Sequence, residues 1–195
     1  MPQLVADFRS THPLVDFQVR IGDHVQALQA LRAFETEVVL AFNLAQEPDL
    51  EVVLRLEQKL VATLHRSHPL AQRPGGLRLR ECMDYPLVLP GRETGGRQLL
   101  ERYLARSSLR LRPTVESNSF EFLRNCLYHE QAISFQMAIG AVTDGGQLVV
   151  REIADTGFPR GQLVMARLAG RQLPVIAHAF AEHVEQGMAV GCPMA

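Results

Sequence analysis

Apolar runs that resemble buried strands alternate with helix-like segments along this chain. Residues 38–42 (VVLAF) are continuously apolar, which is typical of strands that are buried on both faces of a parallel sheet. Residues 24–33 have helical spacing, with Val25, Leu28 and Leu31 on one face and Asp23 in position to cap the first turn. Because strands that alternate with helices build mixed sheets covered by helices, the sequence predicts an α/β fold.

Periodicity predicts the other elements as well. Residues 15–21 alternate apolar and polar side chains, which indicates a strand, and residues 49–56 alternate in the same way. Ser117 or Asn118 is expected to cap a helix at 118–128. The remaining expected strands are 59–64, 87–89, 113–115, 132–135, 147–153 and 163–168, and the remaining expected helices are 3–10, 94–106 and 174–186, followed by a mobile tail at 187–195.

Composition and charge restrict the classes of function. The chain has 195 residues, 47% of them hydrophobic, which is enough for one domain or two small lobes. Its net charge of −1 argues against DNA binding by this segment alone, since phosphate contacts need a clustered basic excess. Three widely spaced cysteines without a CxxC motif favour a reducing compartment. The sequence shows no membrane span and no secretory signal at its start, so a cytoplasmic protein is expected.

Seven segments occur in a characteristic order with characteristic gaps. They are PQLVADFRSTHPLVDFQV, ALQALRAFETEVVLAF, LVATLHRSHPLA, YPLVLPGRETGGRQLLERYL, VESNSFEFLRNCL, AISFQ and PRGQLVMARLAGRQLPVIAHAFAEHV. Together they resemble the effector-binding domain of LysR-type transcriptional regulators over about residues 2–186. The resemblance implies a two-lobed fold of the type 2 periplasmic-binding-protein kind, with two crossover strands at 59–64 and 163–168. It places lobe I at 1–58 plus 164–195 and lobe II at 59–163.

The sequence differs from the family pattern in the segments expected before it and in two motifs. A helix-turn-helix DNA-binding domain and a linker helix normally precede this region, and so does the first strand of lobe I. We therefore expect a fragment or truncated product, with unpaired backbone groups on two neighbouring strands of lobe I. Phe34 and Glu37 stand where the family usually has Gly and Asp, and Glu130-Gln131-Ala132 stands where it usually has Gly-x-Gly.

Candidate effector contacts gather where strands end and helices begin. Exposed N–H groups and the helix dipole favour anions at the helix starts after 91–96 and 116–119. Ordinary helix capping explains the second start equally well, and a turn role is the alternative for the asparagine after residues 38–42. The resemblance favours a role in the effector pocket for Asn118 and Ser119, and it implies that residues 134–136 face the cleft between the lobes. The predicted effector-binding residues are Asn43, Pro90, Thr94, Asn118, Ser119, Ser134 and Gln136.

Motifs for metal or covalent chemistry are weak. His65 and His68 are three residues apart in a loop-like stretch, and His178 and His183 are five apart on a helix, which turns their rings away from each other. The sequence contains no GxSxG motif, and its paired glycines match neither a P-loop nor a dinucleotide fingerprint. We therefore expect no catalytic residue, metal or cofactor. A nucleophilic Cys-His or Ser-His pair is the remaining alternative.

These observations leave three classes of function. The resemblance implies a ligand-sensing domain in which a small-molecule effector binds between the lobes and changes their angle. A homodimer or homotetramer would pass that change to DNA-binding domains outside this chain. The alternative is a transport-type solute-binding protein, against which the motif order and the missing signal argue. An enzyme on this scaffold is a third possibility without a supporting constellation of residues.

Overall fold

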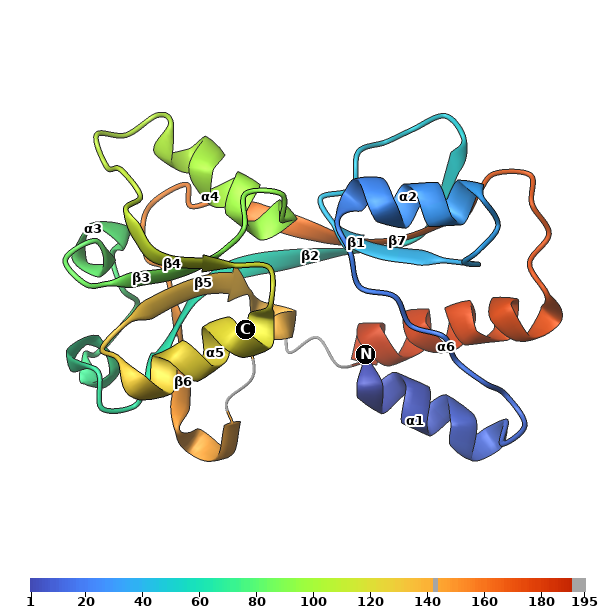
Figure 1. Cartoon of the computed structure of the whole chain (residues 1–195), viewed down its shortest axis with the longest axis horizontal. Coiled ribbons are helices and arrows are strands. Elements are labelled where there is room, and N and C mark those ends of the chain that lie inside the picture. Colours follow the sequence, from blue (N-terminus) through green and yellow to red (C-terminus); the bar gives the residue numbers. More distant parts are fainter. Residues whose placement is uncertain (142–143, 191–195) are drawn as a thin grey trace. The chain divides into compact units, whose positions relative to one another are not determined.

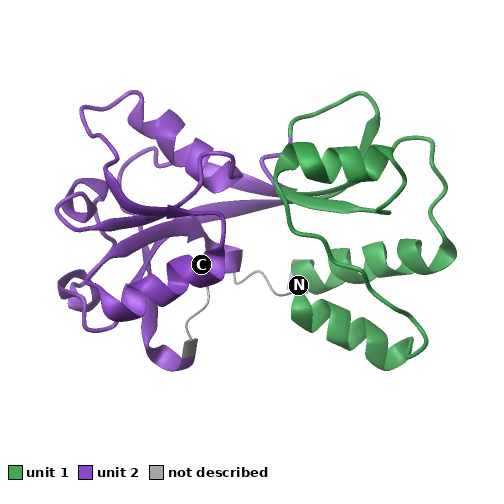
Figure 2. Ribbon diagram, viewed as in Figure 1, with its two compact units in different colours: residues 1–41, 45–55, 164–195 green, residues 42–44, 56–163 purple. Residues whose placement is uncertain are grey.

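The computed structural model describes residues 1–141 and 144–190. Six α-helices and seven strands are present in these described residues (Figure 1). The chain divides into two compact units (Figure 2): unit 1 comprises residues 1–41, 45–55 and 164–195, and unit 2 comprises residues 42–44 and 56–163. Two long strands, β2 (Leu50–His65) and β7 (Arg160–Leu168), contribute residues to both units.

Unit 1 contains three helices and a small group of strands. The helices are α1 (Pro2–Thr11), α2 (His24–Arg32) and α6 (Val175–Val190), and β1 (Val39–Phe42) pairs with β7, which pairs with β2. The predicted cap of α2 is confirmed, because the Asp23 carboxylate accepts a hydrogen bond from the backbone N–H of Gln26 at 2.8 Å. Phe8 of α1 packs against Phe180 of α6 with 5.2 Å between ring centroids, which joins these two helices.

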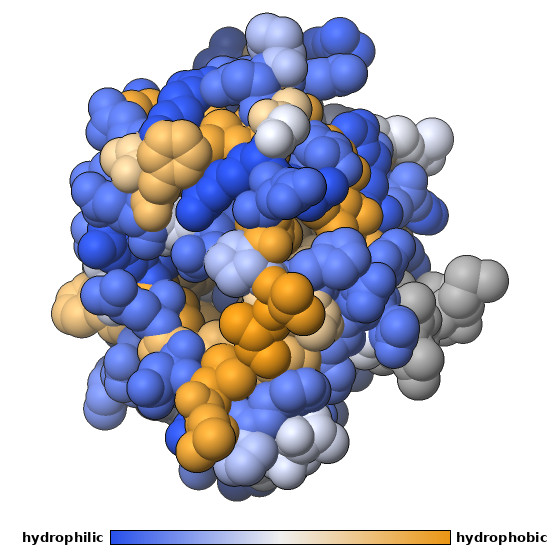
Figure 3. Space-filling view, turned by 90° about the vertical axis from the view of Figure 1, so that its right-hand side faces the viewer, coloured by the Kyte–Doolittle hydropathy of each residue, from blue (hydrophilic) through white to orange (hydrophobic). Residues whose placement is uncertain are grey.

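The predicted strand at 15–21 is wrong. This segment is irregular, and its apolar side chains lie in solvent, with Ile21 96% exposed. Leu14 and Val19 are also exposed. Exposed hydrophobic side chains are a feature of this protein, and Figure 3 shows a group of them on one face. Alternation specifies only which face of a strand would be buried, whereas a strand also needs a neighbour for its backbone N–H and C=O groups. No described strand pairs with this segment.

Unit 2 is built around a mixed sheet. Its strands are β3 (Leu87–Pro90), β4 (Pro113–Ser117), β5 (Ile133–Met137), β6 (Leu148–Glu152) and the unit 2 parts of β2 and β7. Strand β3 runs parallel to β4 and β5, while β5 and β6 run antiparallel to β2. Its helices are α3 (Leu79–Cys82), α4 (Gly95–Leu104) and α5 (Phe120–His129), and short 3-10 turns occupy Pro69–Gln72, Ala138–Gly140 and Asp144–Gly146.

Helices α4 and α5 cover opposite faces of this sheet (Figure 1). Leu100 of α4 packs in a buried cluster with Leu89 and Phe135. Leu127 of α5 packs in a second cluster with Val88, the neighbour of Leu89 in β3. This division follows from the strand geometry, because successive side chains point to opposite faces.

Several boundaries differ from the predictions. Residues 49–56 and 59–64 belong to one strand, β2, since the polar residues between them interrupt the apolar pattern but not the extended backbone. Helix α5 begins at Phe120 and is capped by Ser119, not by Ser117 or Asn118. Helix α6 continues to Val190, so a mobile tail from 187 is wrong for 187–190, and the rest of that prediction, 191–195, lies outside the described residues.

Candidate functional site

The parallel strands of unit 2 end at a common edge of the sheet. Pro90 at the end of β3 pairs in register with Ser117 at the end of β4, and β5 runs in the same direction from the pair Leu87 and Ile133. Helices α4 and α5 begin a few residues after β3 and β4. This edge therefore combines strand carboxyl ends with two helix N-termini, which is where α/β proteins commonly bind ligands.

Thr94 precedes α4 but leaves its first turn open. The Thr94 hydroxyl donates to the carbonyl of Gly91 at 2.8 Å, and the Thr94 N–H donates to the same carbonyl at 3.1 Å. The side chain of Thr94 makes no capping hydrogen bond to the helix. The first N–H groups of α4 are consequently not satisfied by their own cap residue.

A buried arginine behind this helix start was missed by the sequence reasoning. Arg97 is 2% exposed, and its Nη1 lies 2.7 Å from the Glu116 carboxylate of β4 and 3.2 Å from the Pro90 carbonyl of β3. Its Nε donates to Glu101 at 2.9 Å. A buried charge needs such partners, and here they tie two strand ends to α4. The four-residue spacing of Arg97 and Glu101 was the available signal.

Asn118 and Ser119 lie at the second helix start, and both are exposed. Ser119 caps α5, because its hydroxyl accepts from the backbone N–H of Phe122 at 3.2 Å. The Ser119 N–H in turn donates to the Ser117 hydroxyl at 3.1 Å. The cap is thus Ser119, and the capping alternative expected for Ser117 or Asn118 is wrong. The effector contact of Asn118 and Ser119 stays a prediction.

Ser134 and Gln136 lie on the face of β5 opposite to Phe135, which places them on the α5 side of the sheet. Ser134 is buried and pairs in register with Thr63 of β2. Gln136 is partly buried and donates from Nε2 to the Thr63 hydroxyl at 2.8 Å. These three side chains form a polar group on an otherwise apolar sheet, with Gln136 next to the carboxyl end.

Asn43 forms hydrogen bonds through its backbone N–H and through both polar atoms of its side-chain amide. Its backbone N–H donates to the Gln162 carbonyl at 2.7 Å, its Oδ1 accepts from the Gln162 N–H at 2.8 Å, and its Nδ2 donates to the Gly95 carbonyl at 3.2 Å. Its φ of 52° is left-handed, which Asn tolerates. A Cβ on Gly95 would lie 2.5 Å from the Phe42 carbonyl, so this position requires glycine. The three hydrogen bonds and the left-handed φ are what a turn residue needs, which was the alternative expected for Asn43. Effector contact by Asn43 stays a prediction.

The predicted residues are thus arranged around one edge of unit 2. Pro90, Thr94, Asn118 and Ser119 follow the ends of β3 and β4, and Gln136 stands one residue before the end of β5. Ser134 is further back in the strand, and Asn43 reaches the edge through Gly95.

The described residues contain neither a cluster of metal ligands nor a helix that could cross a membrane. Within 1–141 and 144–190, no group of three or more His, Cys, Asp and Glu side chains is arranged to hold a metal ion. Over the same part of the chain, none of the helices has the length and apolar character needed to span a membrane.

Known proteins resemble this chain along most of its length. The family model described as LysR substrate binding domain matches residues 1–189. The HTH-type transcriptional activator CmpR of Synechocystis sp. is 23% identical over 187 residues, which cover 94% of this chain and 60% of CmpR. The chain therefore spans less than two thirds of the length of this curated relative.

Solved structures show the same fold. The effector binding domain of QuiR in complex with shikimate has a TM-score of 0.78 at 18% identity, covering 97% of this chain and 90% of that domain. The regulatory domain of CcmR from Synechocystis in complex with 2-PG has a TM-score of 0.79 at 23% identity, covering 99% and 91%. The predicted α/β fold of the type 2 periplasmic-binding-protein kind is confirmed.

Proposed function

This chain belongs to the LysR substrate binding domain family, and we propose on this premise that it senses a small-molecule effector for a transcriptional regulator. The observation that carries the proposal is the carboxyl edge of the unit 2 sheet, where α4 and α5 begin and where Gln136 lies one residue before the end of β5. The similar domains of QuiR and CcmR were solved with shikimate and 2-PG, which supports a small polar effector. Family membership does not favour the transport-type alternative.

The effector would be recognised by hydrogen bonds at this edge. The open N–H groups at the start of α4 can donate, and Ser134 and Gln136 can both donate and accept. Asn118 is exposed between the end of β4 and the start of α5, so its side-chain amide can also donate and accept. The placement of the effector between two lobes stays a prediction.

The test begins with a thermal-shift screen of small metabolites, because a ligand that binds only the folded state raises the melting temperature. For a hit, we expect Asn118→Ala and Gln136→Ala each to weaken binding at least fivefold in calorimetry. Gln72→Ala is the matched control. Gln72 also donates a side-chain hydrogen bond in unit 2, but its acceptor is the Arg66 carbonyl, and neither residue lies at the carboxyl ends of β3, β4 and β5. An effector that binds all three variants as tightly as the unmodified chain would refute the site.

Oligomerisation and DNA binding belong to the whole regulator. Helix α2 exposes Val25, and α5 exposes Phe120 and Phe122, which supports a homodimer or homotetramer in which these two helices of different copies pack together. DNA would be contacted only through a helix-turn-helix domain outside this chain. A regulator of this kind would act in the cytoplasm as a sensor, not as an enzyme, and without a cofactor.

A further inference from the structure

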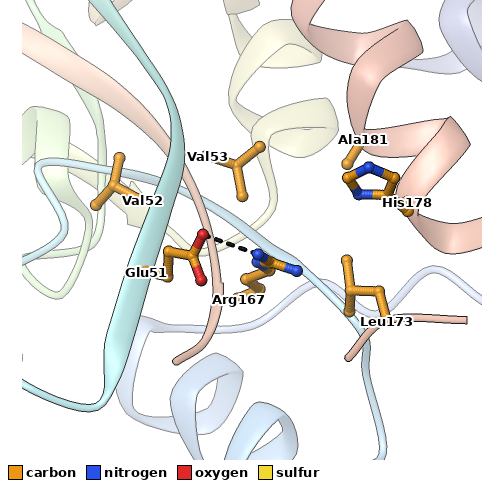
Figure 4. Close-up of a pocket in the computed structure, with 7 residues that line it drawn as sticks. All are labelled: Glu51, Val52, Val53, Arg167, Leu173, His178 and Ala181. Carbon is orange, nitrogen blue, oxygen red and sulfur yellow. Dashed lines mark hydrogen bonds and ion pairs between the residues drawn. The ribbon is translucent and has the colours of Figure 1, made fainter. Parts of the chain in front are cut away.

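Unit 1 has a pocket of its own. It has a volume of about 230 Å³, and Figure 4 shows side chains from β2, β7 and α6 converging on it. The walls are formed by Glu51 and Val53 of β2, Arg167 of β7, Leu173, and His178 and Ala181 of α6. All of these residues belong to unit 1, whereas the predicted effector site belongs to unit 2.

The charged wall of the pocket is an ion pair in which one arginine N–H donor has no acceptor in the described part of the chain. Arg167 Nη2 lies 2.8 Å from Glu51 Oε1, and the Arg167 side chain is 22% exposed. Its Nε is buried and has no hydrogen-bond acceptor among the described residues. Buried donors are nearly always paired, so this Nε–H is a donor that an acceptor on a bound molecule can satisfy.

The remaining walls combine an imidazole with apolar groups. In Figure 4 the Arg167 guanidinium lies between Glu51 on one side and Leu173 and His178 on the other. Ala181 is buried, and Leu173 and Val53 are partly buried. The pocket therefore offers one positive group, one negative group and an aliphatic surface within a small volume.

We propose that this pocket binds a small zwitterion with an aliphatic side chain, of the α-amino acid class. The ligand carboxylate accepts from Arg167 Nε–H, and the ligand ammonium donates to the Glu51 carboxylate. The aliphatic side chain packs against Val53, Leu173 and Ala181. A simple anion would be repelled by Glu51 and a simple cation by Arg167, so a ligand with both charges fits best.

The proposed ligand would connect the two strands that run from one unit into the other. Glu51 lies on β2 and Arg167 on β7, and both strands continue into unit 2. Occupancy of the pocket would therefore stabilise the paired crossover strands. The inference does not rest on the proposed effector site, because it uses residues of unit 1 only.

Calorimetry on the full chain with three related probes tests the proposed chemistry. L-leucine carries both charges, 4-methylpentanoate lacks the ammonium group, and 3-methylbutylamine lacks the carboxylate. We expect leucine to bind at least tenfold more tightly than either of the other two. Equal affinities for leucine and 4-methylpentanoate would overturn the contact with Glu51. If leucine at 10 mM shows no binding, the proposal as a whole is overturned.

Matched arginine variants test the location. Arg167→Lys keeps the charge but removes the Nε–H donor, and we expect it to weaken leucine binding at least tenfold. Arg160→Lys is the control, because Arg160 lies on the same strand and pairs with Glu57 of β2 outside the pocket. Equal effects of the two changes would overturn the proposal. NMR of the unmodified chain gives a second readout: leucine should shift the amide signals of Glu51, Arg167 and His178, and shifts confined to unit 2 would refute the site.

Discussion

At the scale of single residues, His68 makes the stability of the fold depend on pH. Its ring is buried, its Nδ1 accepts from the Leu70 N–H at 3.1 Å, and it packs 4.4 Å from the Tyr85 ring. Burial lowers the pKa of His68 below its ordinary value of 6.5. As the pH falls below 6.5, the unfolded chain takes up a proton that the folded chain does not, so stability is lost between 6.5 and the lower folded pKa. Urea titrations should show a larger loss of unfolding free energy from pH 8 to pH 5.5 in the unmodified chain than in His68→Gln. A His68→Gln chain with the same pH dependence as the unmodified one would contradict the assignment.

At the scale of elements, helix α5 depends on the hydroxyl of Ser119. Ser119→Ala removes the acceptor for the Phe122 N–H and should destabilise the chain by about 1 kcal/mol, whereas Ser119→Asp should retain most of the stability. The unfolding free energy from urea titration measures both changes. Asn118→Ala is the neighbouring control, because the expected cap at Asn118 is not used, and it should change stability by less than about 0.5 kcal/mol. Equal stability of Ser119→Ala and the unmodified chain would show that another group caps the helix.

The elements also show what the sequence could and could not predict. Continuous apolar runs such as 38–42 and the capping residue Asp23 predicted their elements correctly, because burial and local hydrogen bonds are encoded within a few residues. The segment 15–21 has an equally clear alternation but no paired strand, and pairing depends on distant residues. Arg97 shows the same limit at the candidate site. Its burial depends on Glu116, which is brought to it by the parallel pairing of β3 and β4.

At the scale of the whole molecule, the two units share the strands that connect them, and this predicts that they unfold together. Buried residues of β2 lie on both sides of the unit boundary, Leu54 in unit 1 and Leu60 in unit 2, so the loss of one unit exposes part of a strand on which the other depends. The chain contains no tryptophan, so single reporters can be placed in each unit as Phe180→Trp in α6 and Tyr103→Trp in α4. We expect the two fluorescence transitions in urea to have the same midpoint and to coincide with the loss of helical circular dichroism. Two separated midpoints would show that β2 and β7 join independently stable units, and any coupling of ligand binding between the units would then need a different physical route.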